Sequence, residues 1–248
     1  MASEENYISQ QDTEGRQNRL QINLKAAYFN YIIYSLFFIQ LILNLIWVIF
    51  TELGYGYFYG LTKFYFDLEE SVPTYFSAII LLLSSILLAL IGNAKSKLSD
   101  PFSKHWMILS ILFLILSMDE IVGFHEIIID PMNNSFHFNG YWRFSWVIPA
   151  MIFVLFFAIS YLKFLNSLTS KYKKGFIFAG FIYVLGAIVI EMFSAKIFIN
   201  EKDSATDLMY NLVITLEESC EMLGVMIFIS VLLSYIKSMQ YKISVSIK

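Results

Sequence analysis

Six long apolar runs, separated by shorter polar segments, dominate the hydrophobic pattern of the chain. They lie at about residues 26–50, 74–93, 106–129, 142–165, 175–198 and 208–236. Each is close to the ~20 residues that a helix needs to cross the hydrocarbon core of a bilayer. The pattern predicts an all-α polytopic membrane protein, with a bundle of six transmembrane helices in a single domain at residues 25–238.

The polar segments at the two ends of the chain, residues 1–24 and 239–248, are expected to be tails, the first of them partly disordered. Residues 1–23 lack a basic region and a cleavage site, so we expect no removable signal peptide. Thirteen of the 17 Lys and Arg residues lie in the two tails, the loop between runs 2 and 3 and the connection between runs 4 and 5. The positive-inside rule therefore predicts that both termini are cytoplasmic. Short loops and the lack of an organellar signal favour a bacterial inner membrane.

Composition agrees with this class and excludes others. The chain is 58% hydrophobic and 15% charged, with a mean hydropathy of +0.63, which is too apolar for a soluble domain. One cysteine excludes an intramolecular disulfide framework, and a net charge of −3 without a basic block gives no footprint for nucleic acid. The expected partners are the lipid bilayer and cations or protons, and an oligomer is compatible with the sequence.

Three carboxylates lie in the middle of the last apolar run. Glu217, Glu218 and Glu221 fall within about a third of the helix circumference at 100° per residue, so they form one stripe. A carboxylate near the centre of a membrane costs about 2.5–3.5 kcal/mol on insertion scales. No Lys or Arg lies between Lys202 and Lys237 to neutralise the stripe. The partners of these acids must come from other helices or from solution.

Two other runs carry acids at a similar depth. The third run contains Asp119 and Glu120, its strongest candidates, and then His125 and Glu126, which are equally consistent with the site and with the membrane interface. The fifth run contributes Glu191, on a face of small residues. In the predicted topology, the acids of the third, fifth and last runs lie at depths in the membrane that agree to within roughly 10 Å, at 1.5 Å per residue. The acids are therefore predicted to converge in the outer half of the membrane.

Such a cluster implies particular chemistry, because like charges close together in a low dielectric cannot all ionise. They must hold a metal ion, hold protons or line water. Oxygen ligands with one imidazole suit Mn²⁺, Fe²⁺, Ca²⁺ or Mg²⁺, and Zn²⁺ less well, so a divalent metal ion is the suspected cofactor. The predicted metal-binding residues are Asp119, Glu120, His125, Glu126, Glu191, Glu217, Glu218 and Glu221.

Three functions follow from this site. The first is a cation transporter or exchanger, in which Asp67, Glu69 and Glu70 concentrate cations at the outer mouth. The second is a membrane-embedded, metal-dependent enzyme that acts on a lipid or another lipophilic substrate. The third is an accessory subunit of a membrane complex, in which the acids are protonated and only hold helices together.

Several local patterns carry further expectations. The segment 117–120 (Ser-Met-Asp-Glu) parallels 215–218 (Thr-Leu-Glu-Glu), which would fit an inverted repeat of helices 1–3 and 4–6. Ser71 suits the N-cap of the second helix, and Pro149 is expected to kink the fourth. Gln40 and Asn44 are expected to form hydrogen bonds between helices.

Overall fold

The computed structural model describes residues 19–21, 26–55, 60–198, 207–239 and 244–246, and within them six helices are long and apolar enough to cross a membrane. The tail segments 1–18, 22–25, 240–243 and 247–248 lie outside the described residues, so the expected disorder of the first tail stays a prediction. The six spans are α2 (Ala26–Glu52), α3 (Val72–Lys97), α4 (Ser103–Val122), α7 (Val147–Ser167), a continuous run of α8 (Ser170–Val184), η3 (Leu185–Ile190) and α9 (Glu191–Ile197), and α11 (Leu208–Ser238). The predicted helical membrane bundle is confirmed.

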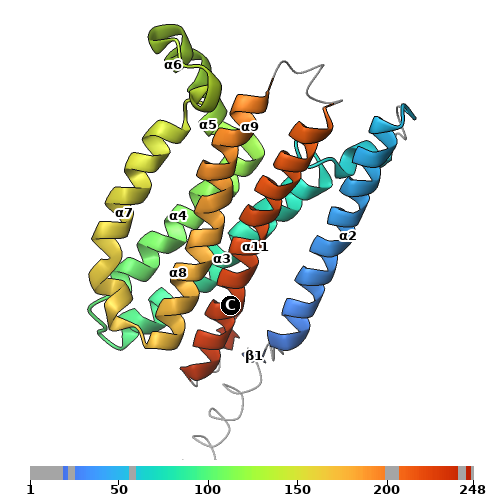
Figure 1. Cartoon of the computed structure of the whole chain (residues 1–248). Coiled ribbons are helices and arrows are strands. Elements are labelled where there is room, and N and C mark those ends of the chain that lie inside the picture. Colours follow the sequence, from blue (N-terminus) through green and yellow to red (C-terminus); the bar gives the residue numbers. More distant parts are fainter. Residues whose placement is uncertain (1–18, 22–25, 56–59, 199–206, 240–243, 247–248) are drawn as a thin grey trace, which may run out of the picture.

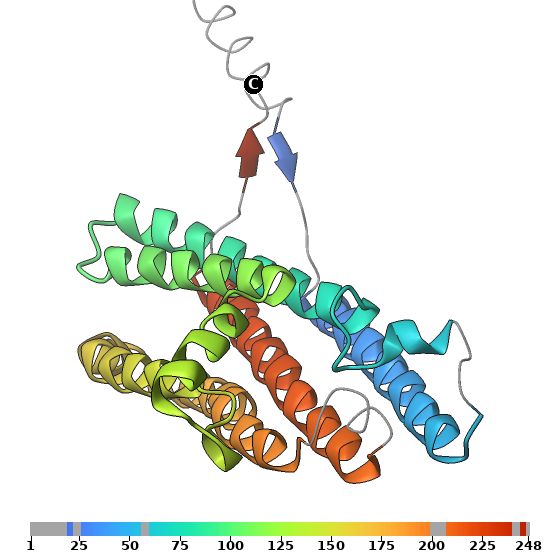
Figure 2. The same ribbon diagram turned by 90° about the horizontal axis from the view of Figure 1, so that it is seen from above.

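The helices run roughly side by side, and α11 lies in the middle of the bundle (Figures 1 and 2). It packs on α2, α3, α8, η3 and α9, whereas α4 packs mainly on α3. We call the end of the bundle at which α2 ends and α11 begins the distal end. The short helices α5 (Phe124–Ile127) and α6 (Ile129–Phe136), together with the 3₁₀ helices η1 (Leu61–Phe64) and η2 (Gly140–Trp142), lie there.

The opposite end holds the only strands among the described residues. Strands β1 (Arg19–Gln21) and β2 (Ser244–Ser246) pair in antiparallel register, outside the bundle (Figure 2). The hydrophobic pattern did not predict them, because three-residue strands are too short to show an alternation. The pairing puts the two end segments of the chain on the same side of the bundle. That this side is cytoplasmic stays a prediction.

Buried apolar side chains form two cores that share α11. One includes Phe37 of α2, Leu81 of α3 and Met222 of α11. The other includes Trp106 of α4 and Phe164 of α7. Outside these cores, large apolar side chains remain exposed along whole helix faces. This is clearest on α7, where seven are exposed, at Met151, Ile152, Phe153, Leu155, Phe156, Ile159 and Leu162. Such faces are suited to contact with lipid.

Two glycines allow α11 to approach the α8–η3 segment closely. A Cβ on Gly224 would lie 2.7 Å from the backbone nitrogen of Tyr183, and a Cβ on Gly186 would lie 2.8 Å from the backbone oxygen of Glu217. Neither distance is possible for a real side chain. Because lipid tails are as apolar as most side chains, helix association in membranes depends on such close packing of small residues.

The third span differs from its prediction. A helix over 106–129 was expected, but α4 ends at Val122, where Gly123 adopts a left-handed conformation with φ 64° and donates its N–H to the Asp119 carbonyl. A glycine in this conformation is a common helix terminator. His125 and Glu126 therefore lie outside the membrane-spanning helix, on α5, which leaves α4 in a new direction.

The expectations for Ser71 and Asn44 are confirmed, whereas the expected hydrogen bond of Gln40 is wrong, because its buried amide has no partner among the described residues. The Ser71 hydroxyl accepts a hydrogen bond from the Thr74 N–H and caps α3, as predicted. Asn44 is fully buried and donates from Nδ2 to Thr215 Oγ1 on α11, as expected for a bond between helices. Pro149 was expected to kink the fourth helix, and α7 begins at Val147, so Pro149 lies in the first turn, where the helix needs no N–H from it.

Candidate functional site

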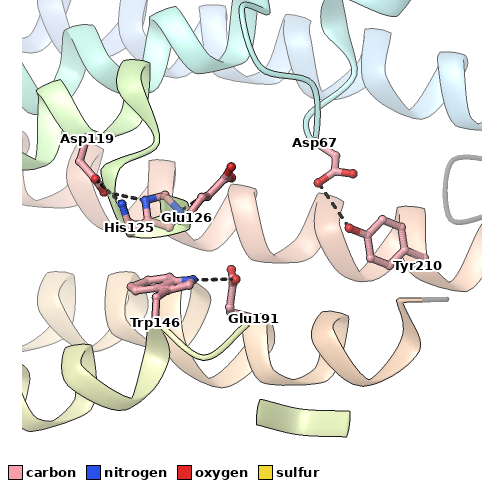
Figure 3. A network of polar contacts seen from close by, with 7 residues as sticks. All are labelled: Asp67, Asp119, His125, Glu126, Trp146, Glu191 and Tyr210. Carbon is pink, nitrogen blue, oxygen red and sulfur yellow. Dashed lines mark hydrogen bonds and ion pairs between the residues drawn. The ribbon is translucent and has the colours of Figure 1, made fainter. Parts of the chain in front are cut away.

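The predicted site residues come together in the distal half of the bundle, from α4, α5, α9 and α11. Figure 3 shows part of this arrangement, with Asp119, His125 and Glu126 on one side, Trp146 and Glu191 facing them, and Asp67 farther along. We call the whole group the acidic layer. It comprises the eight predicted residues, Asp119, Glu120, His125, Glu126, Glu191, Glu217, Glu218 and Glu221.

Glu191 and Glu217 place their carboxyl groups close together between α9 and α11, where the charge of each acts on the other. Glu217 is almost completely buried, with 4% of its surface exposed. Two ionised carboxylates this close to each other and partly shielded from water repel, and a cation or a proton between them relieves the repulsion. The pair is therefore a candidate position for a proton or a metal cation inside the membrane-spanning part of the protein.

Ser194 contacts both members of this pair. Its Oγ lies 2.8 Å from Glu217 Oε2 and 2.9 Å from the Glu191 backbone oxygen, three residues earlier in α9. A hydroxyl has one hydrogen and a carbonyl oxygen has none. The hydrogen of Ser194 can be donated to Glu217 Oε2 on α11 or to the Glu191 carbonyl within α9, so Ser194 links the two helices at the carboxyl pair.

A second group of acids joins α4 to α11. Glu120, Glu218 and Glu221 lie close enough to one another to interact electrostatically, and the ring of Tyr183 on α8 lies beside them. The Glu120 carboxyl also forms a hydrogen bond with Ser77 on α3. All three acids are half-buried rather than enclosed. The structure thus brings the acids of the third and last runs together.

His125 and Asp119 form an ion-pair geometry at the junction of α4 and α5. Asp119 Oδ2 lies 2.7 Å from His125 Nδ1, and Asp119 Oδ1 accepts the His125 backbone N–H at 3.0 Å. Burial alone would lower the pKa of His125, but the hydrogen bond and charge of Asp119 outweigh it and raise the pKa. The imidazole also packs against Trp146, with ring centroids 4.6 Å apart.

Glu126 lies at the outer edge of the acidic layer and meets a residue from another loop. Its carboxyl lies close to that of Glu69, since a Cβ on Gly123 would lie 3.6 Å from Glu126 Oε2 and 3.8 Å from Glu69 Oε1. Burial raises the pKa of Glu126, His125 opposes this, and the Glu69 charge adds to the increase. The carboxylate oxygen lies 4.0 Å from His125 Nε2. Glu126 therefore connects the histidine to the distal loop.

Asp67 forms the outermost part of the network. Its Oδ2 accepts from the Tyr65 hydroxyl at 3.2 Å, and its Oδ1 lies 3.5 Å from the Tyr210 hydroxyl. Protein atoms around Asp67 raise its pKa to about 7, the two tyrosine hydrogen bonds oppose this, and the charges of Glu191 and Glu126 add to the increase. One face of the side chain stays exposed. Asp67 thus lies between the solvent and the deeper acids.

The backbone before Glu191 is unusual and sets the direction of its side chain. Residues Leu185–Ile190 form the π-helix η3, and Glu191 is the first residue of the α-helix that follows. Short π-helical segments within α-helices occur frequently at functional sites. Gly186 of η3 lies directly against Glu217 and Glu221 of α11. The irregular turn therefore contacts the acidic layer itself.

Several residues of the site were not predicted. Trp146 donates to Glu191 Oε1 at 3.0 Å, Ser194 bonds Glu217, and Tyr65 and Tyr210 hold Asp67. The spacing of Ser194, three residues after Glu191 on the same helix face, is the one sequence signal that pointed to any of them. Among the described residues, no three His, Cys, Asp or Glu side chains are arranged to hold one metal ion.

Comparison with known proteins identifies a family. Residues 34–236, which include the whole acidic layer and most of the six-helix bundle, match the model of a family described as a domain of unknown function, DUF8692. No curated protein and no solved structure matches the chain. The family match covers well over half of the sequence. The chain is therefore a member of the DUF8692 family.

Proposed function

We propose that this protein is a cation transporter or exchanger, with the acidic layer as its cation site. The observation that carries the proposal is the close approach of the Glu191 and Glu217 carboxyl groups in the membrane-spanning part of the bundle. A proton held between these two carboxyl groups would be a cation that a competing cation can replace, because both satisfy the same negative charge. Exchange of protons for a metal ion at this layer is the activity that such a pair supports best.

The group of Glu120, Glu218 and Glu221 is the proposed binding position for the transported ion. These three half-buried carboxylates come from α4 and α11 and lie within electrostatic range of one another, and their side chains would have to turn toward one ion to bind it. Oxygen ligands suit Mn²⁺, Fe²⁺, Ca²⁺ or Mg²⁺, and Zn²⁺ less well. His125 would add the nitrogen that a borderline metal prefers.

The distal acids provide the proposed route into this position. Asp67 and Glu126 lie between the solvent at the distal end and the deeper carboxylates. Exposed negative charge around a recess raises the local cation concentration. The distribution of Lys and Arg would put this end on the outer side and the termini in the cytoplasm, in a bacterial inner membrane as the proposed location.

Uptake by proteoliposomes tests the proposal. The protein is reconstituted with an internal metal-sensitive or pH-sensitive dye, and Mn²⁺, Fe²⁺, Ca²⁺, Mg²⁺ and Zn²⁺ are offered one at a time. We expect uptake of at least one ion, accompanied by proton movement in the opposite direction, and its loss in Glu218→Gln/Glu221→Gln. Glu52→Gln, which neutralises an exposed acid at the distal end of α2 outside the acidic layer, is the control. Uptake that survives the double substitution would rule out this site as the transport site.

A membrane-embedded metal-dependent enzyme is the second candidate, and the contact of His125 with Asp119 favours it. A carboxylate bonded to one imidazole nitrogen orients the other nitrogen toward a metal, as in many metal sites. This function requires a metal at one or two equivalents in the purified protein and an altered lipid after overexpression. Elemental mass spectrometry and lipid analysis test it. Metal-free protein together with unchanged lipids would exclude the enzyme.

A further inference from the structure

A separate cavity lies at the distal surface, outside the acidic layer. Its volume is about 330 Å³, at the small end of the range for ligand sites. The walls come from α6, from the segment around η2 and from the end of α9. The lining residues are Ile129, Asp130, Asn133, Phe138, Asn139, Arg143, Phe144 and Phe198.

The cavity carries one full charge of each sign, and the two do not neutralise each other directly. Arg143 and Asp130 both line it, but neither forms an ion pair within the part of the chain that the structure describes. The Arg143 guanidinium lies over the Phe198 ring, with Cζ 4.5 Å from the ring centroid. Stacking on an aromatic ring fixes the plane of a guanidinium while leaving its N–H donors at the edge available.

The walls that hold these charges are linked by hydrogen bonds. Asn133 Nδ2 donates to the Arg143 backbone oxygen at 2.8 Å, and Ser145 Oγ donates to the Ile129 backbone oxygen at 3.3 Å. Both bonds join α6 to the segment before α7. These hydrogen bonds within the folded loop therefore hold the two segments, and with them the two opposite charges, in fixed positions.

Aromatic side chains around the cavity indicate its depth. Phe136, Tyr141 and Trp142 are exposed beside it, and Lys196 donates to the Tyr141 hydroxyl at 2.9 Å. Tyr and Trp gather at the level of lipid headgroups at membrane surfaces, together with basic side chains from helix ends. A cavity at this level is open to molecules that carry headgroup chemistry.

We propose that this cavity binds a zwitterion with a phosphate and a primary ammonium group, the chemistry of ethanolamine phosphate. The phosphate would accept hydrogen bonds from Arg143, which suits phosphate geometry better than lysine does. The ammonium would donate to Asp130. A molecule that carries both charges pairs with Arg143 and with Asp130, whereas an anion alone leaves Asp130 without a counter-charge. This ligand is distinct from the cation of the acidic layer.

Lipid binding to the purified protein tests this site without any variant. Binding of short-chain phosphatidylethanolamine, phosphatidylcholine and phosphatidylglycerol is measured by native mass spectrometry in a non-ionic detergent. Phosphatidylethanolamine is expected to bind about tenfold more tightly than phosphatidylcholine, because a trimethylammonium group has no N–H to donate to Asp130. Phosphatidylglycerol, which has no cation, is expected to bind no better than phosphatidylcholine. Equal binding of all three lipids would overturn the proposal.

Single substitutions then test which part of the ligand each of the two charged residues binds. Arg143→Gln is expected to weaken phosphatidylethanolamine binding about tenfold, and Asp130→Asn to remove the preference over phosphatidylcholine. Lys196→Gln, which removes a cation at the same depth outside the cavity, is the control and should bind as the wild type does. A loss in Lys196→Gln equal to that in Arg143→Gln would show general surface charge and contradict the site.

Soluble phosphoethanolamine identifies the source of the ligand. If it binds as tightly as the lipid, the cavity takes a free solute, and if only the lipid binds, the cavity takes a headgroup with its chains in the bilayer. Both results support a site for this zwitterion. Binding of neither phosphoethanolamine nor phosphatidylethanolamine by the wild type would refute it.

Discussion

Trp146 Nε1 donates a hydrogen bond to Glu191 Oε1 at 3.0 Å, and the same indole packs on the imidazole of His125. One side chain thus contacts both the carboxyl pair of α9 and α11 and the histidine of α5. Trp146 lies in the segment that precedes α7, so this segment contributes to the acidic layer although it carries no acid of its own there. The orientation of Glu191 depends on it.

Trp146→Phe keeps an aromatic ring against His125 and removes only the N–H that orients Glu191. A hydrogen bond to a charged or charge-sharing group contributes about 1.5–3 kcal/mol. We expect the apparent cation affinity in proteoliposome uptake to fall about tenfold, with a melting temperature close to that of the wild type. Trp142→Phe, at an exposed tryptophan of η2, is the control. Unchanged affinity in Trp146→Phe would show that the indole does not position the carboxylate.

Gly186→Ala tests the close approach of η3 to α11. The new Cβ would lie 2.8 Å from the Glu217 backbone oxygen, so the helices must separate. Overpacking of this kind costs about 1–3 kcal/mol. A lower melting temperature in detergent is expected. Gly180→Ala is the matched control, because its Cβ would meet nothing within 4 Å and alanine favours a helix. Equal stability of the two variants would contradict the close contact.

The raised pKa of Asp67 predicts that the stability of the protein depends on pH. Its pKa is about 7 in the folded protein and 3.8 in the reference state, so the folded state binds more protons between these values. The contribution of Asp67 to the free energy of unfolding is therefore highest below about pH 4 and falls as the pH rises to about 7. Asp67→Asn removes this change. The melting temperature of the variant relative to that of the wild type should rise across this range.

The comparison of wild type and Asp67→Asn isolates Asp67 from its neighbours. His125 has a raised pKa, so its contribution to stability is present at low pH and is lost as the pH rises through that value, in both proteins alike. Glu70→Gln serves as the control for removing an acid from the same loop. A constant difference in melting temperature between pH 4 and pH 8 would argue against the raised pKa of Asp67.

Asn44 and Gln40 form a natural pair for testing buried amides in α2. Asn44 donates to Thr215 Oγ1 and accepts the Phe66 N–H at 3.1 Å, so Asn44→Ala leaves buried groups unpaired and should cost about 1–3 kcal/mol. The Gln40 amide is buried and has no partner among the described residues. Gln40→Leu is therefore expected to keep or raise the melting temperature. Thermal unfolding of both variants in the same detergent compares them, and a greater loss in Gln40→Leu would contradict this interpretation.

The sequence was sufficient for the number of spans and for the acids, because a run of about 20 apolar residues is typical of a membrane span and a carboxylate within one is rare. Glu191, Glu217 and Glu221 were found in this way. The depth argument placed them at one level, and in the structure they do lie against one another. That argument relied on the 1.5 Å rise per residue, which hardly depends on the details of packing.

The rest of the site depended on features that periodicity does not encode. The left-handed Gly123 ends α4 early and turns His125 into the layer, whereas a regular helix would have carried it outward. Trp146 and Tyr65 come from segments whose aromatic residues looked like a membrane-interface belt. Only the folded loops reveal which of them reach a carboxyl group. The internal repeat of the two halves stays a prediction.

The π-helix η3 adds an extra residue to the fifth span relative to a regular α-helix. An α-helix of the same length would use fewer residues per turn, so rewinding η3 would advance the following segment by about 1.5 Å and rotate it by about 100°. Glu191 and Ser194 lie together on α9, so both would leave Glu217 in a single step. Such a rotation would separate Glu191 from Glu217 without any change in the length of α11.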